Sequence, residues 1–430
     1  MSVSEQSASV ENKTQQPLLK FFTPTEKDWR CLEISTLDEK DEIEKSPSDK
    51  KDELEKIKFN NDALREMLLS ALQMPNLVVL SGSGTSLGNV GGPSMWNLWD
   101  YAVNENAGAS NSDPRTQTAE AELVINKISF NSLQEGENIE ALLSRCEAWL
   151  QINDDDNEVS HFVKKSKAII LDKCQSFLKD NKLDAHCSFL RKLSRRSARN
   201  PRLKVFTTNY DLCFERAAAL QNLIVVDGFS FSQPRTFNPL YFGYDIVRRS
   251  RLTEEHGDYL EGVFHLLKLH GSVNWEYIDG VIQEKKDPEP DKACLIYPAR
   301  GKYQQSYLQP HLELVSQFFS SLREPNTCLI VAGFGFNDDH LSEPILAAVK
   351  SNPHLKLIVF DYCAENSTNG NNEKASRYWR ELFKLANDDV DVSFLNADFE
   401  KFVSLIPDLK ALSRAQKLEQ AVLNSVKGRS

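Results

Sequence analysis

The stretch Asn76-Leu-Val-Val-Leu-Ser-Gly-Ser-Gly-Thr-Ser-Leu-Gly-Asn-Val-Gly-Gly-Pro93 decides how the rest of the sequence is interpreted. Its four apolar residues, 77–80, predict a short buried strand of an α/β sheet. The glycines that follow permit a sharp turn and let a ligand approach the main chain without meeting a Cβ atom. Main-chain N–H groups in such a turn, next to a helix start, attract phosphate. The spacing G-x-G-x-x-x-G of Gly82, Gly84 and Gly88 differs from the strict dinucleotide fingerprint, so the loop is either a phosphate cradle or a plain turn.

The composition is that of a globular protein. Of the 430 residues, 40% are hydrophobic and 26% are charged, as in folded domains, and the length suggests two or three domains. The net charge of −11 argues against broad binding of duplex nucleic acid, which needs clustered Lys and Arg. The basic run 191–199 is the best candidate for a local basic patch, but we favour a solvated helix face.

The cysteines and the N-terminus indicate a reducing compartment. Eight cysteines are scattered along the chain without a C-x-x-C pair, so a structural zinc site of the usual spacing is not expected. The N-terminus is polar and lacks the apolar segment of a signal peptide. No stretch approaches the ~18–20 apolar residues of a membrane span. We therefore expect a cytoplasmic protein with free cysteines and no membrane contact.

Apolar segments alternate with helical patterns over much of the chain. The predicted strands are 77–80, 203–208, 223–226, 266–269, 293–297, 327–332, 355–360 and 392–395. Helices are predicted between the strands from 203 onward, and they begin at residues 212, 310 and 340. This alternation predicts an α/β fold with a doubly wound, mostly parallel, Rossmann-like sheet. In such a sheet, ligands bind at the carboxyl ends of the strands.

The domain organisation is predicted from changes in composition and periodicity. Residues 61–104 and 201–400 would form the Rossmann-like domain, with an inserted helical subdomain at 105–200. The insert is predicted from the helical periodicity of its apolar residues, and it would be either a lid or purely architectural. Residues 1–60 would form a charged N-terminal arm, and residues 401–430 a C-terminal helix. The arm would be either an assembly surface or a solubilising tail.

Four of the predicted strands are followed by motifs that can carry chemistry. These motifs are G-S-G-T-S at 82–86, T-N-Y-D at 208–211, H-G at 270–271 and G-F-G-F-N-D at 333–338. If the strands are neighbours, the motifs line one crevice. The glycine turns would then take pyrophosphate or ribose, Asn209 and Asp211 would bind ribose hydroxyls or a water, and His270 could act as a base near neutral pH.

Each motif also has a structural explanation. Asn209 and Asp211 could cap the helix that begins at 212, His270 could be a structural histidine, and the glycine turns could be only turns. The occurrence of all four motifs in this order favours a ligand site.

The set G-S-G-T-S, T-T-N-Y-D, K-L-H-G and G-F-G-F-N-D resembles the sirtuin fold family, and specifically its bacterial sirtuin-like branch found in antiphage defence. The resemblance covers roughly residues 70–100 and 200–365. It implies that NAD is bound as the substrate. It also implies that His270 is the catalytic base, and that Asn209 and Asp211 orient the nicotinamide ribose and a water.

The resemblance further implies which residues hold the dinucleotide. The diphosphate and the adjacent ribose would lie against the first glycine turn, the nicotinamide ribose against the T-x-N-x-D segment, and the adenosine side against the second glycine turn. In chain order, the implied NAD-binding residues are Gly82, Ser83, Gly84, Thr85, Thr208, Gly333, Gly335 and Asn337.

Departures from the family decide the expected activity. Deacylase sirtuins carry a small zinc module with paired C-x-x-C motifs, which this sequence lacks, so no zinc is expected. Without a peptide acceptor, water is the natural nucleophile at the ribose anomeric carbon. We therefore expect an NAD hydrolase that releases nicotinamide and ADP-ribose and depletes NAD in an abortive-infection response. The alternatives are an NAD-dependent protein deacylase and a non-enzymatic sensor of NAD or ADP-ribose.

The same resemblance implies partners. Sirtuin-like subunits of two-gene defence systems pair with a hexameric HerA-type ATPase, and this chain contains no G-x-x-x-x-G-K-[ST] motif of its own. We expect a homo-oligomer that associates with a HerA-type ATPase or helicase, and that meets nucleic acid only through that partner.

Overall fold

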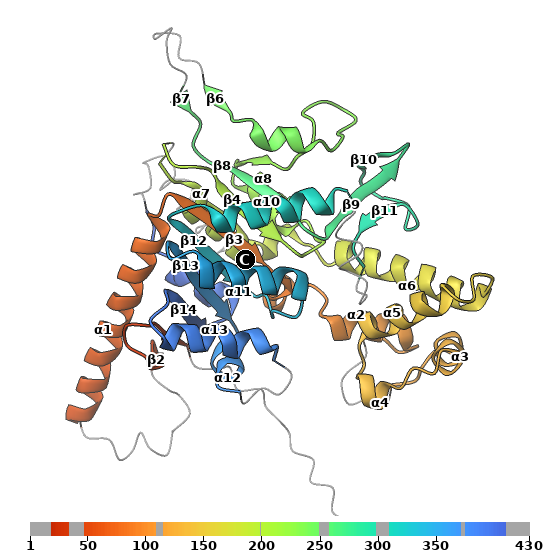
Figure 1. The fold of residues 1–430 in the computed structure, drawn as a ribbon, viewed down its shortest axis with the longest axis horizontal. Coiled ribbons are helices and arrows are strands. Elements are labelled where there is room, and N and C mark those ends of the chain that lie inside the picture. Colours follow the sequence, from red (N-terminus) through yellow and green to blue (C-terminus); the bar gives the residue numbers. More distant parts are fainter. Residues whose placement is uncertain are drawn as a thin grey trace, which may run out of the picture.

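A central sheet is covered by helices on both faces, and a further group of helices extends to one side of it (Figure 1). The computed structural model describes residues 19–33, 47–108, 115–197, 199–248, 258–297, 309–370 and 375–409. None of the helices within these ranges is long and apolar enough to cross a lipid bilayer.

Over the described ranges, the central sheet has nine strands in the order β2-β1-β14-β13-β12-β3-β4-β8-β5. Their bounds are β1 Lys20–Phe22, β2 Arg30–Cys31, β3 Asn76–Ser81, β4 Leu203–Thr207, β5 Ile224–Val226, β8 Val263–Lys268, β12 Thr327–Ala332, β13 Leu355–Asp361 and β14 Val392–Asn396. Between β14 and β5, each strand runs parallel to the next. The predicted doubly wound, mostly parallel α/β sheet is therefore confirmed.

The apolar run of β3 shows why these strands are buried on both faces. Val78 and Leu80 pack into the core beneath one layer of helices, formed by α10 His311–Arg323, α11 Asp339–Ser351 and α13 Arg377–Asn387. Leu77 and Val79 pack into the opposite core, beneath α1 Pro47–Leu72, α7 Asp184–Ser194, α8 Cys213–Leu220 and α14 Phe399–Leu405. A continuous apolar strand is typical of a parallel sheet that helices cover on both sides.

The helices at the side of the sheet have a core of their own. They are α2 Met95–Val103, α3 Ala119–Lys127, α4 Ser132–Glu135, α5 Ile139–Leu150 and α6 Asn157–Ser176. Trp99, Leu142 and Phe162 lie in this core. Phe189 of α7 instead packs in the core beneath the sheet. The sequence boundaries at 105 and 200 stay predictions, but the side core draws on α2, α3, α5 and α6.

A small antiparallel sheet, in the order β10-β9-β11, stands next to the carboxyl end of β8. Its strands are β9 Gly271–Ile278, β10 Val281–Glu284 and β11 Ala293–Leu295. The strand predicted at 293–297 therefore exists as β11 but lies outside the parallel sheet. Asp279 and Gly280 join β9 to β10 with φ angles of 49° and 82°, as in a type I′ hairpin turn.

Short elements complete the described structure. They are β6 Val247–Arg248, β7 Asp258–Tyr259, α12 Ala364–Thr368 and the 3-10 segments η2 Ser83–Thr85, η3 Gly88–Val90, η4 Asp180–Lys182 and η5 Pro239–Gly243. β6 and β7 form a ribbon that projects at the top of the view in Figure 1.

The N-terminal region contributes to the sheet of its own chain. β1 pairs antiparallel with β14, and β2 pairs with β1. Phe21 and Phe22 are buried on opposite faces of the sheet. The sequence did not predict these two strands, because the segment is short and polar on both sides. The predicted C-terminal helix from 410 onward lies outside the described residues.

Candidate functional site

The four motif-bearing strands are neighbours in the sheet. Their order is β12-β3-β4-β8, and the register pairs Ala332 with Ser81, Ser81 with Thr207, and Thr207 with Lys268. All four strands therefore end at the same level. The chain proceeds from β3 toward β4 on one side and returns to β12 on the other, so the sheet reverses its order between β3 and β12. Ligands of doubly wound sheets bind outside the carboxyl ends at such a reversal.

A cavity of about 190 Å³ lies at this place. Seven of the residues predicted from the sequence line it, namely Ser83, Thr208, Asn209, Asp211, His270, Gly335 and Asn337. The other lining residues are Ser86, Gly92, Pro93, Met95, Leu98, Glu140, Cys174, Phe177, Tyr210, Phe334 and Asp338. The structure thus brings the amide, the carboxylate and the imidazole to one cavity.

The predicted glycines outside this lining hold the two turns together. The N–H of Gly84 donates to the carbonyl oxygen of Gly333 over 2.9 Å. A Cβ atom on Gly82 would lie 2.7 Å from that oxygen, and one on Gly84 would lie 2.7 Å from the Cα atom of Gly333. Contacts this short do not occur between a real Cβ and a backbone, so the glycines permit the close packing of one turn on the other. Gly333 also has a φ of 56°.

Thr85 is buried beneath the first turn. Its hydroxyl donates to the carbonyl oxygen of Gly82 over 2.9 Å and lies 2.8 Å from the hydroxyl of Ser81. Its side chain therefore stabilises the turn from below, whereas Ser83 at the top of the turn is exposed to the cavity.

Asn209 connects β4 to the glycine turn. Its side-chain nitrogen donates to the carbonyl oxygen of Gly82 over 3.0 Å and to the hydroxyls of Thr85 and Ser86 over 3.2 and 2.9 Å. Its backbone N–H donates to the hydroxyl of Thr207 over 3.0 Å. Asn209 is thus fixed by hydrogen bonds at the edge of the cavity.

Asp211 serves the helix start and the cavity at once. One carboxylate oxygen accepts the backbone N–H of Cys213 over 2.9 Å, at the start of α8. The other accepts the hydroxyl of Ser86 over 2.7 Å. Asp211 therefore supports the first N–H group of α8 from one residue before the N-cap position, Leu212, and the same carboxylate borders the cavity.

His270 is buried with a second imidazole. It is 2% exposed and its Nε2 atom lies 3.2 Å from Nε2 of His340, which is 5% exposed. The ring centroids lie 5.3 Å apart and the ring planes are inclined by 30°. His340 was not predicted from the sequence, although it stands seven residues after Gly333, just beyond the second glycine motif. Over the described ranges, no group of three or more His, Cys, Asp or Glu side chains is arranged to hold a metal ion.

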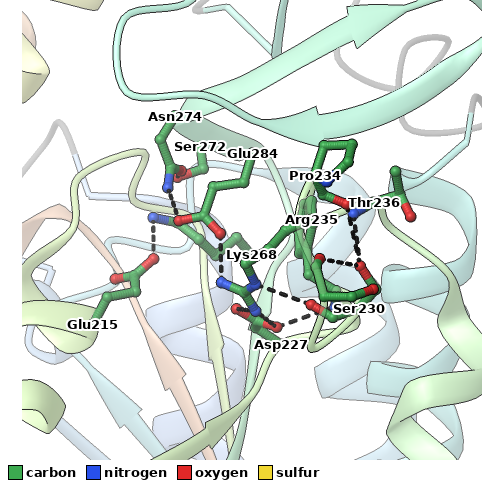
Figure 2. A network of polar contacts seen from close by, with 12 residues as sticks. Glu215, Asp227, Ser230, Pro234, Arg235, Thr236, Lys268, Ser272, Asn274 and Glu284 are labelled. Carbon is green, nitrogen blue, oxygen red and sulfur yellow. Dashed lines mark hydrogen bonds and ion pairs between the residues drawn. The ribbon is translucent and has the colours of Figure 1, made fainter.

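A buried lysine supports the T-N-Y-D segment from behind. Lys268, at the end of β8, is 2% exposed and forms an ion pair of 2.9 Å with Glu215 (Figure 2). Its ammonium also donates to the backbone carbonyl oxygens of Tyr210 and Asp211. Burial raises the pKa of Glu215, and the neighbouring Lys268 opposes that shift. The signal for this residue was a lysine at the end of an otherwise apolar strand.

A second polar chain, also visible in Figure 2, lies beside that pair. Asn274 of β9 accepts from the hydroxyl of Ser272 and donates to Glu284, and Arg235 bridges Glu284 to Asp227. These contacts attach the small antiparallel sheet, which begins directly after His270, to the loop that follows β5.

The side helices supply a largely apolar wall. Met95 and Leu98 of α2 and Phe177 after α6 line the cavity together with Cys174. Burial raises the pKa of the Cys174 thiol to about 12, so the thiol is neutral. Among the described residues that line the cavity there is no Lys or Arg, whereas Glu140, Asp211 and Asp338 are acidic.

Residues 203–383 match the family model of the SIR2-like domain. This range contains the T-N-Y-D segment, His270 and the second glycine turn, and it begins after the first glycine turn. The comparison with curated proteins found no match.

Solved structures of sirtuins also align with the chain. One is a Sir2 homologue in complex with NAD, 13% identical, covering 79% of this chain and 91% of its own with a TM-score of 0.38. Another is a Sir2 homologue mutant in complex with ADP-ribose, 13% identical, covering 81% of this chain and 99% of its own with a TM-score of 0.38. A third is a Sir2 protein bound to a propionylated peptide, 13% identical, covering 79% of this chain and 95% of its own with a TM-score of 0.37.

Proposed function

We propose that this protein is an NAD hydrolase that cleaves NAD to nicotinamide and ADP-ribose. The observation that carries the proposal is the strand order β12-β3-β4-β8, which gathers Ser83, Asn209, Asp211 and His270 around one cavity at the reversal of the sheet. The SIR2-like match of residues 203–383 supports the choice of NAD as the nucleotide.

The cavity lining suits parts of this substrate. Met95, Leu98 and Phe177 form an apolar wall against which the planar nicotinamide ring would pack. Ser83, Gly335 and Asn337 lie at the cavity surface beside the two glycine turns, where they would meet the diphosphate.

Cleavage of the glycosidic bond of NAD needs little general-acid catalysis from the protein. The bond between the ribose anomeric carbon and the ring nitrogen breaks with its electron pair on nitrogen, so nicotinamide leaves as a neutral molecule. Water then forms the new bond to carbon, and His270 takes the proton that the water loses. Asn209 and Asp211 would position the ribose and the water, since orientation is the larger contribution in such a reaction.

The experiment is to incubate pure protein with NAD and to measure nicotinamide and ADP-ribose by chromatography. Asn209→Ala and His270→Ala should each abolish release, whereas Gly243→Ala, at a position with open space around it, should not. Turnover that needs an acetyl-lysine peptide would instead indicate a deacylase. Tight NAD binding without turnover in wild-type protein would indicate a sensor.

The biological setting follows from the same resemblance. We propose that the enzyme acts in the cytoplasm in abortive-infection antiphage defence, as a homo-oligomer held inactive until it is triggered within a complex with a HerA-type ATPase. Co-purification with the ATPase from the neighbouring gene, followed by light scattering, tests the complex. A monomer that neither binds the ATPase nor changes turnover in its presence would contradict this setting.

A further inference from the structure

The pair of imidazoles at the floor of the cavity carries a further inference. His270 follows β8 and lines the cavity. His340 is the second residue of α11, and its Nε2 atom lies 3.2 Å from Nε2 of His270. Two nitrogens at this distance share one proton, because two N–H groups would clash and two bare lone pairs would repel. One of the two Nε2 atoms therefore donates to the other, and the orientation of the His270 ring is tied to that of His340.

His340 is held in place by a rigid surrounding. Phe336 in the preceding loop packs edge to face on Trp379, and the indole N–H of Trp379 donates to the carbonyl oxygen of Gly335 over 3.1 Å. Asp339, next to His340, accepts the hydroxyl of Tyr378 over 3.0 Å. The loop and the first turn of α11 are thus attached to α13, so the His340 ring is presented to His270 by a fixed scaffold.

We propose that His340 is a positioning residue of the candidate site, which holds the ring of His270 in its orientation through the hydrogen bond between the two Nε2 atoms. The role in turnover rests on the proposed NAD hydrolysis, whereas the hydrogen bond itself does not. His340 acts here as the orienting group of a base–orienter pair.

The hydrogen bond is tested directly by nitrogen-15 magnetic resonance on the full chain labelled at its eight histidines. We expect a scalar coupling between two Nε2 atoms across the hydrogen bond, and we expect it to vanish in His270→Gln and in His340→Gln. His265→Gln, at a buried imidazole on the same strand β8, is the matched control and should leave the coupling intact. Absence of the coupling in the wild-type protein would overturn the proposal.

The role in turnover is tested with two variants of His340. His340→Phe keeps a ring of similar size but no acceptor, and should lower kcat on the order of 10–100-fold with little change in KM. His340→Gln offers an amide oxygen near the former Nε2 position and should recover most of that loss. A folded His340→Phe enzyme with wild-type kcat, or a His340→Gln enzyme no better than His340→Phe, would overturn the positioning role. If wild-type protein does not hydrolyse NAD, the proposed function fails, and the coupling measurement alone decides whether the pair exists.

Discussion

The side-chain amide of Asn209 donates a hydrogen bond of 3.0 Å to the carbonyl oxygen of Gly82, and so ties the end of β4 to the glycine turn after β3. Asn209, which would position the ribose in the proposed reaction, therefore also stabilises the glycine turn that would hold the dinucleotide. Mutations at Asn209 change both the positioning of the substrate and the shape of its binding loop.

Asn209→Ala should lower the free energy of unfolding by about 1–3 kcal/mol, because it leaves a buried turn without its donor. Chemical denaturation measures this change. Asn76→Ala is the matched control, since it also removes an amide that donates to a carbonyl oxygen, that of Pro325, but at an exposed position. A loss no larger than that of Asn76→Ala would contradict the bracing role.

Gly84→Ala should destabilise the protein by about 1–3 kcal/mol, because the added Cβ meets the Gly333 backbone and one of the two turns must shift. The same shift should weaken NAD binding, measured by calorimetry. Gly243→Ala adds a methyl group in open space and serves as the control. Equal midpoints of unfolding for the two variants would refute the tight packing of the turns.

Lys268→Met should cost about 2–4 kcal/mol of stability, because it removes three interactions of a buried ammonium and leaves Glu215 without its cation. Lys350→Met removes an exposed ion pair with Glu381 and should cost about 0.5 kcal/mol or less. Denaturant unfolding of both variants gives the comparison. If the two losses were similar, Lys268 would not support the T-N-Y-D segment as the contacts indicate.

Stability should fall as the pH decreases from about 6.5 to about 4. Burial lowers the pKa of His186, His265 and His311 to about 4 in the folded protein, while the unfolded chain takes up these protons near pH 6.5. Unfolding therefore binds protons in this window, and each group contributes on the order of 3 kcal/mol that is present above pH 6.5 and lost as the pH falls to about 4.

His186 offers the sharpest test of that pH dependence. It is fully buried between the rings of Phe214 and Phe399, and neither ring nitrogen has a hydrogen-bond partner among the described residues. His186→Leu should make the loss of stability between pH 7 and pH 5 shallower, as measured by denaturation at both pH values. An unchanged pH slope in the variant would show that His186 is not neutral in the folded state.

The sequence was sufficient for the parallel sheet and for seven of the residues that line the cavity. The apolar runs at 77–80 and 327–332 become β3 and β12, and the turns that follow them meet because these strands are adjacent. The sequence did not indicate what the glycines of the first turn contact. Gly82 and Gly84 looked open to a ligand, but their close neighbours are the atoms of the Gly333 turn, which only the three-dimensional packing brings near.

Other features were not predicted because their signals are weak or distant. β9 and β10 were missed although Asp279-Gly280 is a strong hairpin signal between them. His340 and Lys268 gain their importance from partners 70 and 53 residues away in the chain, His270 and Glu215. Periodicity cannot report such contacts, since it describes only the local face of each element.

The most direct test of the account is the release of nicotinamide from NAD by the purified protein, alone and with its proposed ATPase partner, followed by chromatography. We predict equal amounts of nicotinamide and ADP-ribose from wild-type protein, and none from Asn209→Ala or His270→Ala. Intact NAD under both conditions, or undiminished release in both folded variants, would contradict the assignment of this cavity as the site of NAD hydrolysis.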